Sequence, residues 1–199
     1  MAKIAEDINK TGGFNPYELS WGDEVTFPST RTIKEYGNRI YNRYPARSIF
    51  MVPRAILYHQ ESNNLHVLDP FMGSGTTAVE TVLSGNIPFG LEMDPFARLV
   101  SEVSSSVFKE EQLIELNRYY NAVLETWRCF DPAPIPELVG IERWFNDGDL
   151  KLLLRLKNCI SKTVPSPYID FMLVAFADCI KPVSKMERQS LKPYISTKY

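Results

Sequence analysis

The stretch Asp69-Pro70-Phe71-Met72-Gly73-Ser74-Gly75-Thr76-Thr77 decides the fold, because it lies where a predicted strand turns into a predicted helix. Residues 65–68 are a short apolar run, and its length and flanking residues predict a buried strand. Residues 76–83 predict a helix that ends at Ser84-Gly85, where the glycine is a natural C-cap. Residues 87–93 predict a second strand. The order of strand, glycine turn, helix and strand indicates one βαβ unit with parallel strands.

Periodicity predicts helices on both sides of this unit. Residues 32–60 are amphipathic, and Pro45 and Pro53 divide them into a helix before Pro45 and another after Pro53. Residues 110–129 predict a long helix, with apolar side chains at three- and four-residue spacing: Leu113, Leu116, Tyr120 and Leu124. Residues 168–180 predict a further helix, although their apolar character also fits a strand.

Composition is that of an ordinary globular protein. Of the 199 residues, 44% are hydrophobic and 23% are charged, which argues against disorder. The length predicts a single domain over residues 1–199, with residues 1–30 as an irregular N-terminal arm. No apolar run approaches the roughly 20 residues that a bilayer needs and no secretory signal is seen, so we expect a cytoplasmic protein without membrane contact. Cys129, Cys159 and Cys179 lack the spacing of a disulfide framework or a zinc site, so no metal is predicted.

The glycine turn is suited to a nucleotide-like ligand. Gly73 and Gly75 lack the Cβ atoms that would block a close approach to the backbone amides of the turn and of the helix N-terminus. Thr76 and Thr77 are placed to cap the helix, and Asp69 is placed to hold a polar or cationic group. The sequence therefore predicts a binding site at the carboxyl end of the first strand.

Glu92 ends the second predicted strand, roughly 20 residues after Asp69, as in dinucleotide folds. A carboxylate there commonly holds both hydroxyls of a ribose, because it accepts two hydrogen bonds at once. Phosphate fits poorly, since no lysine follows Gly75 and Asp69 would repel an anion. A nucleoside without phosphates and with a positive centre fits better, and S-adenosylmethionine has that chemistry.

Three segments together resemble the DNA amino-methyltransferases, which methylate N6 of adenine or N4 of cytosine. Residues 69–77 closely resemble motif I of that family, residues 90–95 (Gly-Leu-Glu-Met-Asp-Pro) resemble motif II, and residues 44–47 (Tyr-Pro-Ala-Arg) resemble motif X. The resemblance implies an α/β fold of the Rossmann-like S-adenosylmethionine-dependent methyltransferase type, with an incomplete sheet and helical additions. It covers residues 44–94 well and residues 181–199 only loosely.

By this resemblance the cofactor is S-adenosyl-L-methionine, Glu92 holds its ribose, and Met93 packs on its adenine. Motif X helps to close the pocket around the methionine end, and no covalent enzyme intermediate is implied. The cofactor-binding residues implied by motifs X, I and II are Tyr44, Pro45, Ala46, Arg47, Asp69, Pro70, Phe71, Gly73, Ser74, Gly75, Thr76, Thr77, Glu92 and Met93. Purely structural alternatives are an ordinary tight turn at the glycines, an exposed strand end at Glu92 and a helix break at residues 44–47.

The family's catalytic motif, Asp/Asn/Ser-Pro-Pro followed by an aromatic residue, has no full match, so no catalytic residue is assigned. Residues 15–17 and 166–168 lack the second proline, and residues 131–134 lack the aromatic residue. In the order X, I, II, the catalytic motif and the target-recognition region follow on the C-terminal side. We therefore expect a complementing subunit or C-terminal half that carries them; a naturally split enzyme and a truncated sequence both fit.

The acidic turn at residues 146–149 has two interpretations. It resembles the motif III turn with which the family reads the adenine amino group, although it lies unusually far beyond Glu92. Alternatively, Asp147 or Asp149 simply caps a helix predicted over residues 150–160.

The charge and the family's strand order both point to a partner. The net charge is −2, whereas a chain that grips DNA by itself is usually basic. Two basic segments, residues 31–54 and 181–199, are either solvated faces or phosphate-facing edges. In the family, strand four pairs with strand one, so the edge of residues 65–68 would be an aggregation hazard without the complementing part.

The function expected from these features is that of a DNA methyltransferase, specific for adenine N6 or cytosine N4 and belonging to a restriction–modification system. This chain would supply S-adenosylmethionine binding, would be active only with the complementing chain, and would meet double-stranded DNA through the assembled enzyme. Two alternatives stay open. One is a non-catalytic S-adenosylmethionine-binding regulatory or assembly protein, and the other is an RNA amino-methyltransferase.

Overall fold

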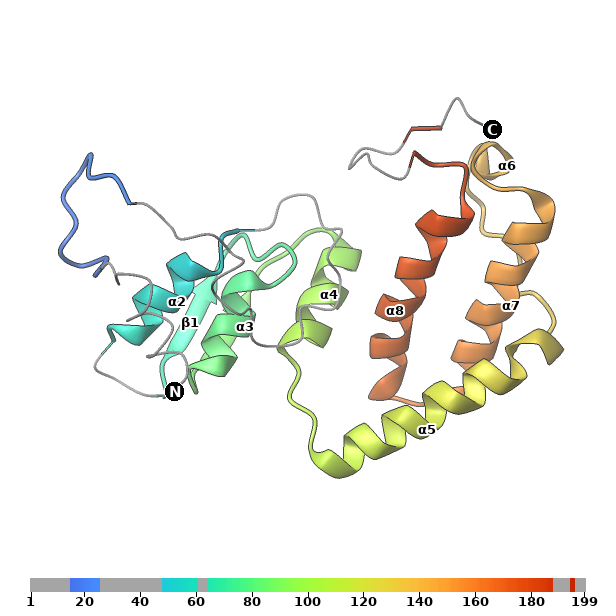
Figure 1. Cartoon of the computed structure of the whole chain (residues 1–199), viewed down its shortest axis with the longest axis horizontal. Coiled ribbons are helices and arrows are strands. Elements are labelled where there is room, and N and C mark those ends of the chain that lie inside the picture. Colours follow the sequence, from blue (N-terminus) through green and yellow to red (C-terminus); the bar gives the residue numbers. More distant parts are fainter. Residues whose placement is uncertain (1–14, 26–47, 61–63, 188–193, 196–199) are drawn as a thin grey trace. The chain divides into compact units, whose positions relative to one another are not determined.

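The structure is a computed structural model that describes residues 15–25, 48–60, 64–187 and 194–195 (Figure 1). The chain divides into two compact units, Met1–Ser106 (unit 1) and Val107–Tyr199 (unit 2). The single domain expected over residues 1–199 stays a prediction, because a division into compact units does not test whether the two fold together. In the predicted N-terminal arm, residues 15–25 form turns and bends and no helix or strand.

Unit 1 is built on a parallel βαβ motif, as predicted. Strands β1 (His66–Asp69) and β2 (Ile87–Gly90) pair in parallel, and helix α3 (Thr76–Leu83) connects them and packs against both. Helices α2 (Met51–Tyr58) and α4 (Pro95–Ser105) pack against α3 (Figure 1). The described sheet has these two strands. The arrangement is compatible with a methyltransferase fold, and its Rossmann-like identity stays a prediction.

The core of unit 1 lies between its helices and one face of the sheet. Its buried apolar side chains are Phe50, Met51, Ala55, Leu57, Ala78, Val79, Ala97, Val100 and Val103. The other face of the sheet is exposed: the side chain of Leu68 is 63% exposed and that of Phe89 is 50% exposed. The expectation of a buried first strand is therefore wrong, because no described element covers that face.

Three boundaries in unit 1 differ from the predictions. Helix α2 begins before Pro53 instead of after it, because a proline in the first helical turn costs no intrahelical hydrogen bond. Strand β2 ends at Gly90 instead of Met93, since the chain turns there to bind the loop that follows β1. Helix α4 was not predicted at all.

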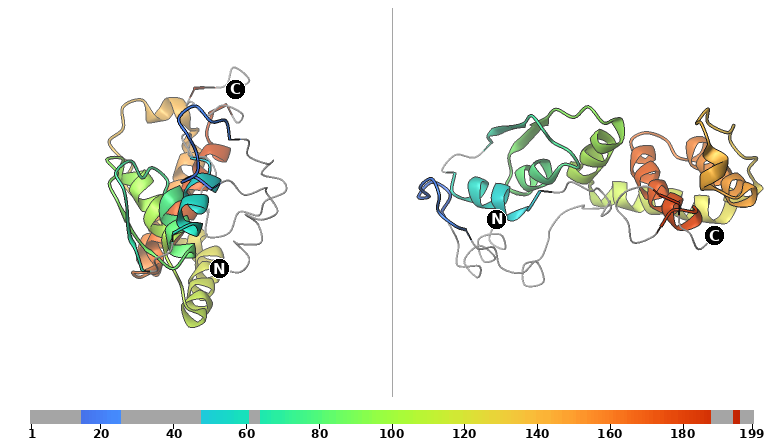
Figure 2. Two further views of the ribbon diagram at one scale, coloured as in Figure 1. Left: turned by 90° about the vertical axis from the view of Figure 1, so that its left-hand side faces the viewer. Right: turned by 90° about the horizontal axis from the view of Figure 1, so that it is seen from above.

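Unit 2 is helical. It contains α5 (Glu110–Thr126) with a single 3-10 turn after it (Trp127–Cys129), α6 (Ile141–Trp144), α7 (Asp147–Thr163) and α8 (Tyr168–Val183). Helices α7 and α8 lie side by side, and α5 packs against α7 (Figure 2). Their shared core consists of Leu116, Val123, Cys159, Ile160, Val164, Tyr168 and Met172.

The helices predicted over residues 110–129 and 168–180 are confirmed, and the strand alternative for the second is wrong. Of the four apolar residues that suggested the first helix, only Leu116 is buried. The other three, Leu113, Tyr120 and Leu124, are about half exposed, because α5 turns the face with Leu116 and Val123 toward the core. Within the described ranges, no helix is long and apolar enough to cross a membrane.

Candidate functional site

The glycine turn follows β1 directly and is fixed by hydrogen bonds. The Gly75 N–H donates to the Met72 carbonyl at 3.0 Å, and the Met72 N–H donates to the Leu91 carbonyl at 3.1 Å. The Phe71 N–H donates to Oδ1 of Asp69 at 2.9 Å. The turn is therefore tied to the carboxylate that precedes it and to the chain just beyond β2, so its backbone is held in place without a ligand.

Gly75 is required by the fold of the chain itself. Its φ of +84° lies in the left-handed region that favours glycine, and the φ of Gly73 is +54°. A Cβ on Gly75 would lie 2.9 Å from both Cα and Cβ of Ser101, so α4 packs directly against the turn. Gly90 is similarly covered by the side chain of Met72. No local pattern in the sequence assigns a role to Gly90 or Met72, because only the tertiary packing brings them together.

Glu92 binds the glycine turn instead of ending in solvent. Its Oε2 accepts a hydrogen bond from the Gly73 N–H at 2.8 Å, and its Oε1 accepts one from the Asp94 N–H at 2.8 Å. A carboxylate offers about four acceptor positions, so each oxygen keeps one for a further donor. The predicted ribose contact is compatible with this arrangement and stays a prediction.

Two apolar side chains flank the turn without serving the core. Phe71, which follows β1, is 90% exposed, and Met93, which follows β2, is 97% exposed. The core of unit 1 therefore does not account for either side chain. Their position fits the predicted contact with the flat adenine ring and the cofactor pocket, which stays a prediction.

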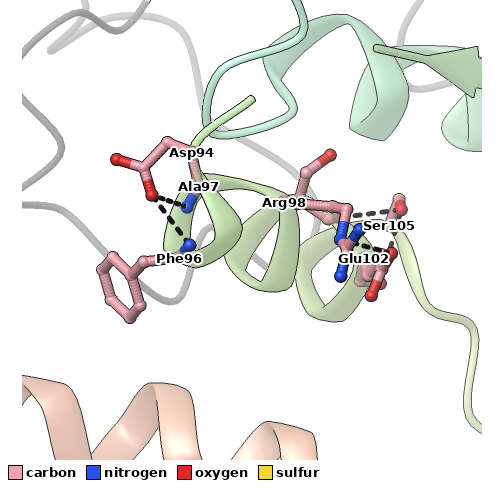
Figure 3. Close-up of polar contacts among 7 residues, drawn as sticks. Asp94, Phe96, Ala97, Arg98, Glu102 and Ser105 are labelled. Atoms are coloured by element: carbon pink, nitrogen blue, oxygen red, sulfur yellow. Dashed lines mark hydrogen bonds and ion pairs between the residues drawn. The ribbon is translucent and has the colours of Figure 1, made fainter. Parts of the chain in front are cut away.

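Helix α4 begins at Pro95, and Asp94 immediately before it fixes its start. Oδ1 of Asp94 accepts hydrogen bonds from the N–H groups of Phe96 at 2.8 Å and Ala97 at 3.2 Å (Figure 3). Pro95 occupies the first helical position, where its missing N–H costs nothing. An Asp-Pro pair at a helix start is a recognised sequence signal, and it would have revealed α4.

The remaining motif I residues are placed as follows. Thr76 and Thr77 form the first turn of α3, and Gly75 is the N-cap residue, so the prediction that the threonines cap the helix is wrong. Pro70 is exposed and Ser74 is half-buried within the turn. The motif X residues Tyr44, Pro45, Ala46 and Arg47 lie outside the described residues.

A buried ion pair joins α2 to α3. Nε of Arg54 lies 2.7 Å from Oε2 of Glu80, and Nη2 of Arg54 lies 3.0 Å from Oε1, which makes the contact bidentate. The side chains are 3% and 1% exposed. The Arg54 guanidinium also lies 4.6 Å from the centre of the Phe50 ring. This pair fixes α2 on α3, the helix that follows the glycine turn, and no pattern in the sequence predicted it.

The acidic turn at residues 146–149 forms the start of α7. Asn146 is the N-cap residue, and its Nδ2 donates to Oδ2 of Asp149 at 3.3 Å. Asp147 and Asp149 lie inside the first turn, where acids are favourable, so neither is itself the cap. The helix predicted over residues 150–160 is confirmed as part of α7, the prediction that Asp147 or Asp149 caps it is wrong, and the adenine-reading role stays a prediction.

The partial catalytic motif at residues 166–168 serves the core of unit 2. The Tyr168 side chain is buried, and its hydroxyl donates to Oε2 of Glu115 at 2.5 Å. This hydrogen bond, followed by burial and the negative charge of Glu115, raises the pKa of Tyr168 from 10.0 to about 12. A ring held in this way is not available to stack on a base.

The titration of Tyr168 tests this contact. Because its pKa is higher in the folded than in the unfolded chain, its contribution to stability is complete below pH 10 and is lost as the pH rises through about 12. In difference absorbance titrations of the chain against Tyr168→Phe, we expect one tyrosine to ionise near pH 12. In Glu115→Gln that ionisation should move down toward pH 10. An unchanged titration in Glu115→Gln would contradict the assignment.

The fold and the site are compatible with one class of protein. A glycine turn between a parallel strand and a helix, with Asp69 at the end of β1 and Glu92 just beyond the end of β2, is typical of α/β proteins that bind nucleosides. No family model matches the chain, and no solved structure matches it significantly.

Two curated proteins narrow the class. The chain is 27% identical to the type II methyltransferase M.MvaI of Kocuria varians over 177 residues, which cover 84% of this chain and 38% of that protein. It is 37% identical to the type II methyltransferase M.BsoBI of Geobacillus stearothermophilus over 59 residues, which cover 30% of this chain and 11% of that protein. The chain thus spans less than two fifths of these relatives. The similarity supports a relation to the DNA methyltransferases.

Proposed function

We propose that this chain is the S-adenosylmethionine-binding part of a DNA amino-methyltransferase of a restriction–modification system, acting on adenine N6 or cytosine N4. The observation that carries the proposal is the arrangement of Asp69 and Glu92 at the carboxyl ends of two parallel strands, on either side of a glycine turn. The turn leads into α3, and the N-cap residue Gly75 has no side chain that could accept hydrogen bonds from the N–H groups of the first helical turn.

The residues suit the parts of this cofactor. When bound, S-adenosylmethionine supplies an activated methyl group on a positively charged sulfonium. The Asp69 carboxylate supplies negative charge near that cation, and Glu92 keeps free acceptor positions for ribose hydroxyls. Phe71 and Met93 offer exposed apolar surface for the adenine. The hydrogen bonds within the turn keep these groups in place before binding, which lowers the entropy lost when the ligand binds.

The proposal includes a complementing part that carries the catalytic motif and the target-recognition region. One support is that M.MvaI is more than twice as long as the segment that matches this chain. The other is that Tyr168 of the partial motif at residues 166–168 packs in the core of unit 2 and binds Glu115. The net charge of −2 favours DNA contact through the assembled enzyme and not through this chain alone. In that assembly the target amine would be oriented toward the methyl group, and this orientation would lower the activation barrier to methyl transfer.

Calorimetric titration of the chain with S-adenosylmethionine tests the site. Asp69→Ala and Glu92→Ala each remove a charged acceptor, a loss of about 1.5–3 kcal/mol, which corresponds to roughly 10- to 100-fold weaker binding. Glu102→Ala is the matched control, because it removes an exposed acid of the same unit whose ion pair with Arg98 contributes little. Equal affinity for S-adenosylmethionine in the unaltered chain and in all three variants would refute the site.

A further inference from the structure

Helix α7 of unit 2 carries a row of basic and polar side chains along one side (Figure 1). Lys151, Arg155, Asn158 and Lys162 follow one another at four- and three-residue spacing, which places them on one face of the helix. Lys151 and Lys162 are exposed, and Arg155 and Asn158 are half-buried. The row contains no apolar side chain. We call these four residues the basic stripe.

The charges of α7 are divided along its length. Its acids, Asp147 and Asp149, lie in the first turn. Residues 150–163 contain no acid and four cations, namely the three of the basic stripe and Lys157. The whole chain, in contrast, has 24 acidic residues against 22 Lys and Arg residues. The basic stripe is therefore a local concentration of positive charge, which the net charge of the chain does not reveal.

Two residues of the basic stripe are held in place by the loop that follows α5. Nη1 of Arg155 donates to the Arg128 carbonyl at 3.0 Å, and Nδ2 of Asn158 donates to the Asp131 carbonyl at 2.8 Å. A guanidinium has five N–H donors, so the bond to Arg128 leaves donors of Arg155 for an anion. The loop also brings the acid Asp131 to this side of α7, where the three cations of the stripe outnumber it.

Contacts within the chain do not neutralise the two lysines of the basic stripe. Among the described residues, neither Lys151 nor Lys162 makes an ion pair or a hydrogen bond. Asp147 lies four residues before Lys151, at the spacing of a helical ion pair, but the pair is not formed. The helix dipole favours Lys162 in the last turn, but it gives no reason for Lys151 near the start of the helix.

We propose that the basic stripe binds the phosphate backbone of double-stranded DNA in the assembled enzyme. A row of cations without apolar side chains fits a polyanion better than a protein partner, because the centre of a protein interface is depleted of lysine. That the polyanion is DNA rests on the proposed function.

The length of the basic stripe suits this ligand. Lys151 and Lys162 lie about 16 Å apart along the helix axis, from a rise of about 1.5 Å per residue. Each strand of a DNA duplex carries a phosphate about every 3.4 Å of its axis, so the stripe can meet more than one phosphate. Contacts of this kind position a duplex and read no sequence.

The salt dependence of DNA binding tests the basic stripe. Binding of the full chain to a short fluorescent duplex is followed by fluorescence anisotropy over a series of salt concentrations. The stripe alone offers few contacts, so we expect weak, non-specific binding whose log affinity falls linearly with log salt concentration. In the variant that combines Lys151→Gln with Lys162→Gln, the slope should fall by about 1.8, since each phosphate contact contributes roughly 0.9.

Lys157→Gln is the matched control, because Lys157 is an exposed lysine of the same helix on a different side. We expect it to leave the slope unchanged, and Lys151→Arg combined with Lys162→Arg, which keeps both charges, to do the same. Three results would overturn the proposal. They are no binding of the unaltered chain at low salt, an unchanged slope in the double glutamine variant, and a loss per lysine in Lys157→Gln as large as in that variant.

Calorimetry with S-adenosylmethionine separates this inference from the proposed function. The basic stripe belongs to unit 2 and the glycine turn to unit 1, so the double glutamine variant should bind S-adenosylmethionine as the unaltered chain does. A chain that binds S-adenosylmethionine, but whose salt slope does not depend on Lys151 and Lys162, would refute the stripe alone. A chain that shows the expected slopes, but binds no S-adenosylmethionine, would refute the cofactor role alone.

Discussion

Glu80→Ala is expected to destabilise unit 1 by about 3–5 kcal/mol, because it leaves the Arg54 guanidinium buried without its bidentate carboxylate. The penalty comes from the desolvated positive charge and exceeds the loss of two neutral hydrogen bonds. Urea unfolding, followed by amide exchange of α3 and β2, measures this loss in unit 1. Since α3 carries the glycine turn, local opening should also become more frequent at Thr76 and Thr77.

The matched control replaces both charges with apolar groups of similar size. Arg54→Met combined with Glu80→Leu removes the buried ions together, and such replacements are often neutral or stabilising. We therefore expect the double variant to recover most of the stability that Glu80→Ala loses. If Glu80→Ala and the double variant are equally unstable, the loss is one of packing and not of the broken ion pair.

Gly75→Ala is expected to destabilise unit 1 by about 2–5 kcal/mol, since a left-handed residue gains a Cβ and that Cβ collides with α4. The colliding atoms include Cα of Ser101, which cannot move without shifting the helix. Binding of S-adenosylmethionine should weaken together with stability, because the displaced turn positions Gly73 and Phe71. Urea unfolding and calorimetry measure the two effects.

Gly85→Ala separates the two causes. Gly85 has a φ of +80°, close to that of Gly75, but a Cβ there would meet no atom within 4 Å. Gly85→Ala should therefore lose only the stability that a left-handed backbone costs an alanine, about 1–2 kcal/mol. Its affinity for S-adenosylmethionine should be unchanged. A Gly85→Ala loss as large as that of Gly75→Ala would show that contact with Ser101 adds nothing.

The sequence predicted the βαβ unit because its signals are local. Helix α3 spans the residues that the apolar run and Gly85 indicated, and β1 is displaced by one residue from its predicted position. Strand β2 is shorter than predicted because the Leu91 carbonyl binds the glycine turn, and that bond joins residues 19 positions apart along the chain. Helix α4 was missed although its Asp-Pro start is equally local.

The site was predicted as a set of residues but not as a network. Asp69, Gly73, Gly75 and Glu92 do meet at one place, since parallel strands share a carboxyl edge. No pattern in the sequence indicates that Glu92 binds the Gly73 N–H, because that bond depends on the exact path of the turn. The exposed face of the sheet, with Leu68 and Phe89, was not predicted for a related reason: an apolar run shows that a strand is to be covered, but not which part of a protein covers it.

Pro88 limits how this chain can misassemble. A sheet that accepts strands at both edges can be extended without end, copy after copy, as fibrils are. Here Pro88 lies at the centre of β2, and its missing N–H interrupts a hydrogen-bond ladder at the outer edge of that strand. Two copies that paired through β1 would therefore form a symmetric dimer whose outer strands are both β2, and neither outer strand offers a complete ladder to a third copy. Among the described residues, self-pairing through β1 is therefore expected to stop at a dimer and not to continue into a polymer.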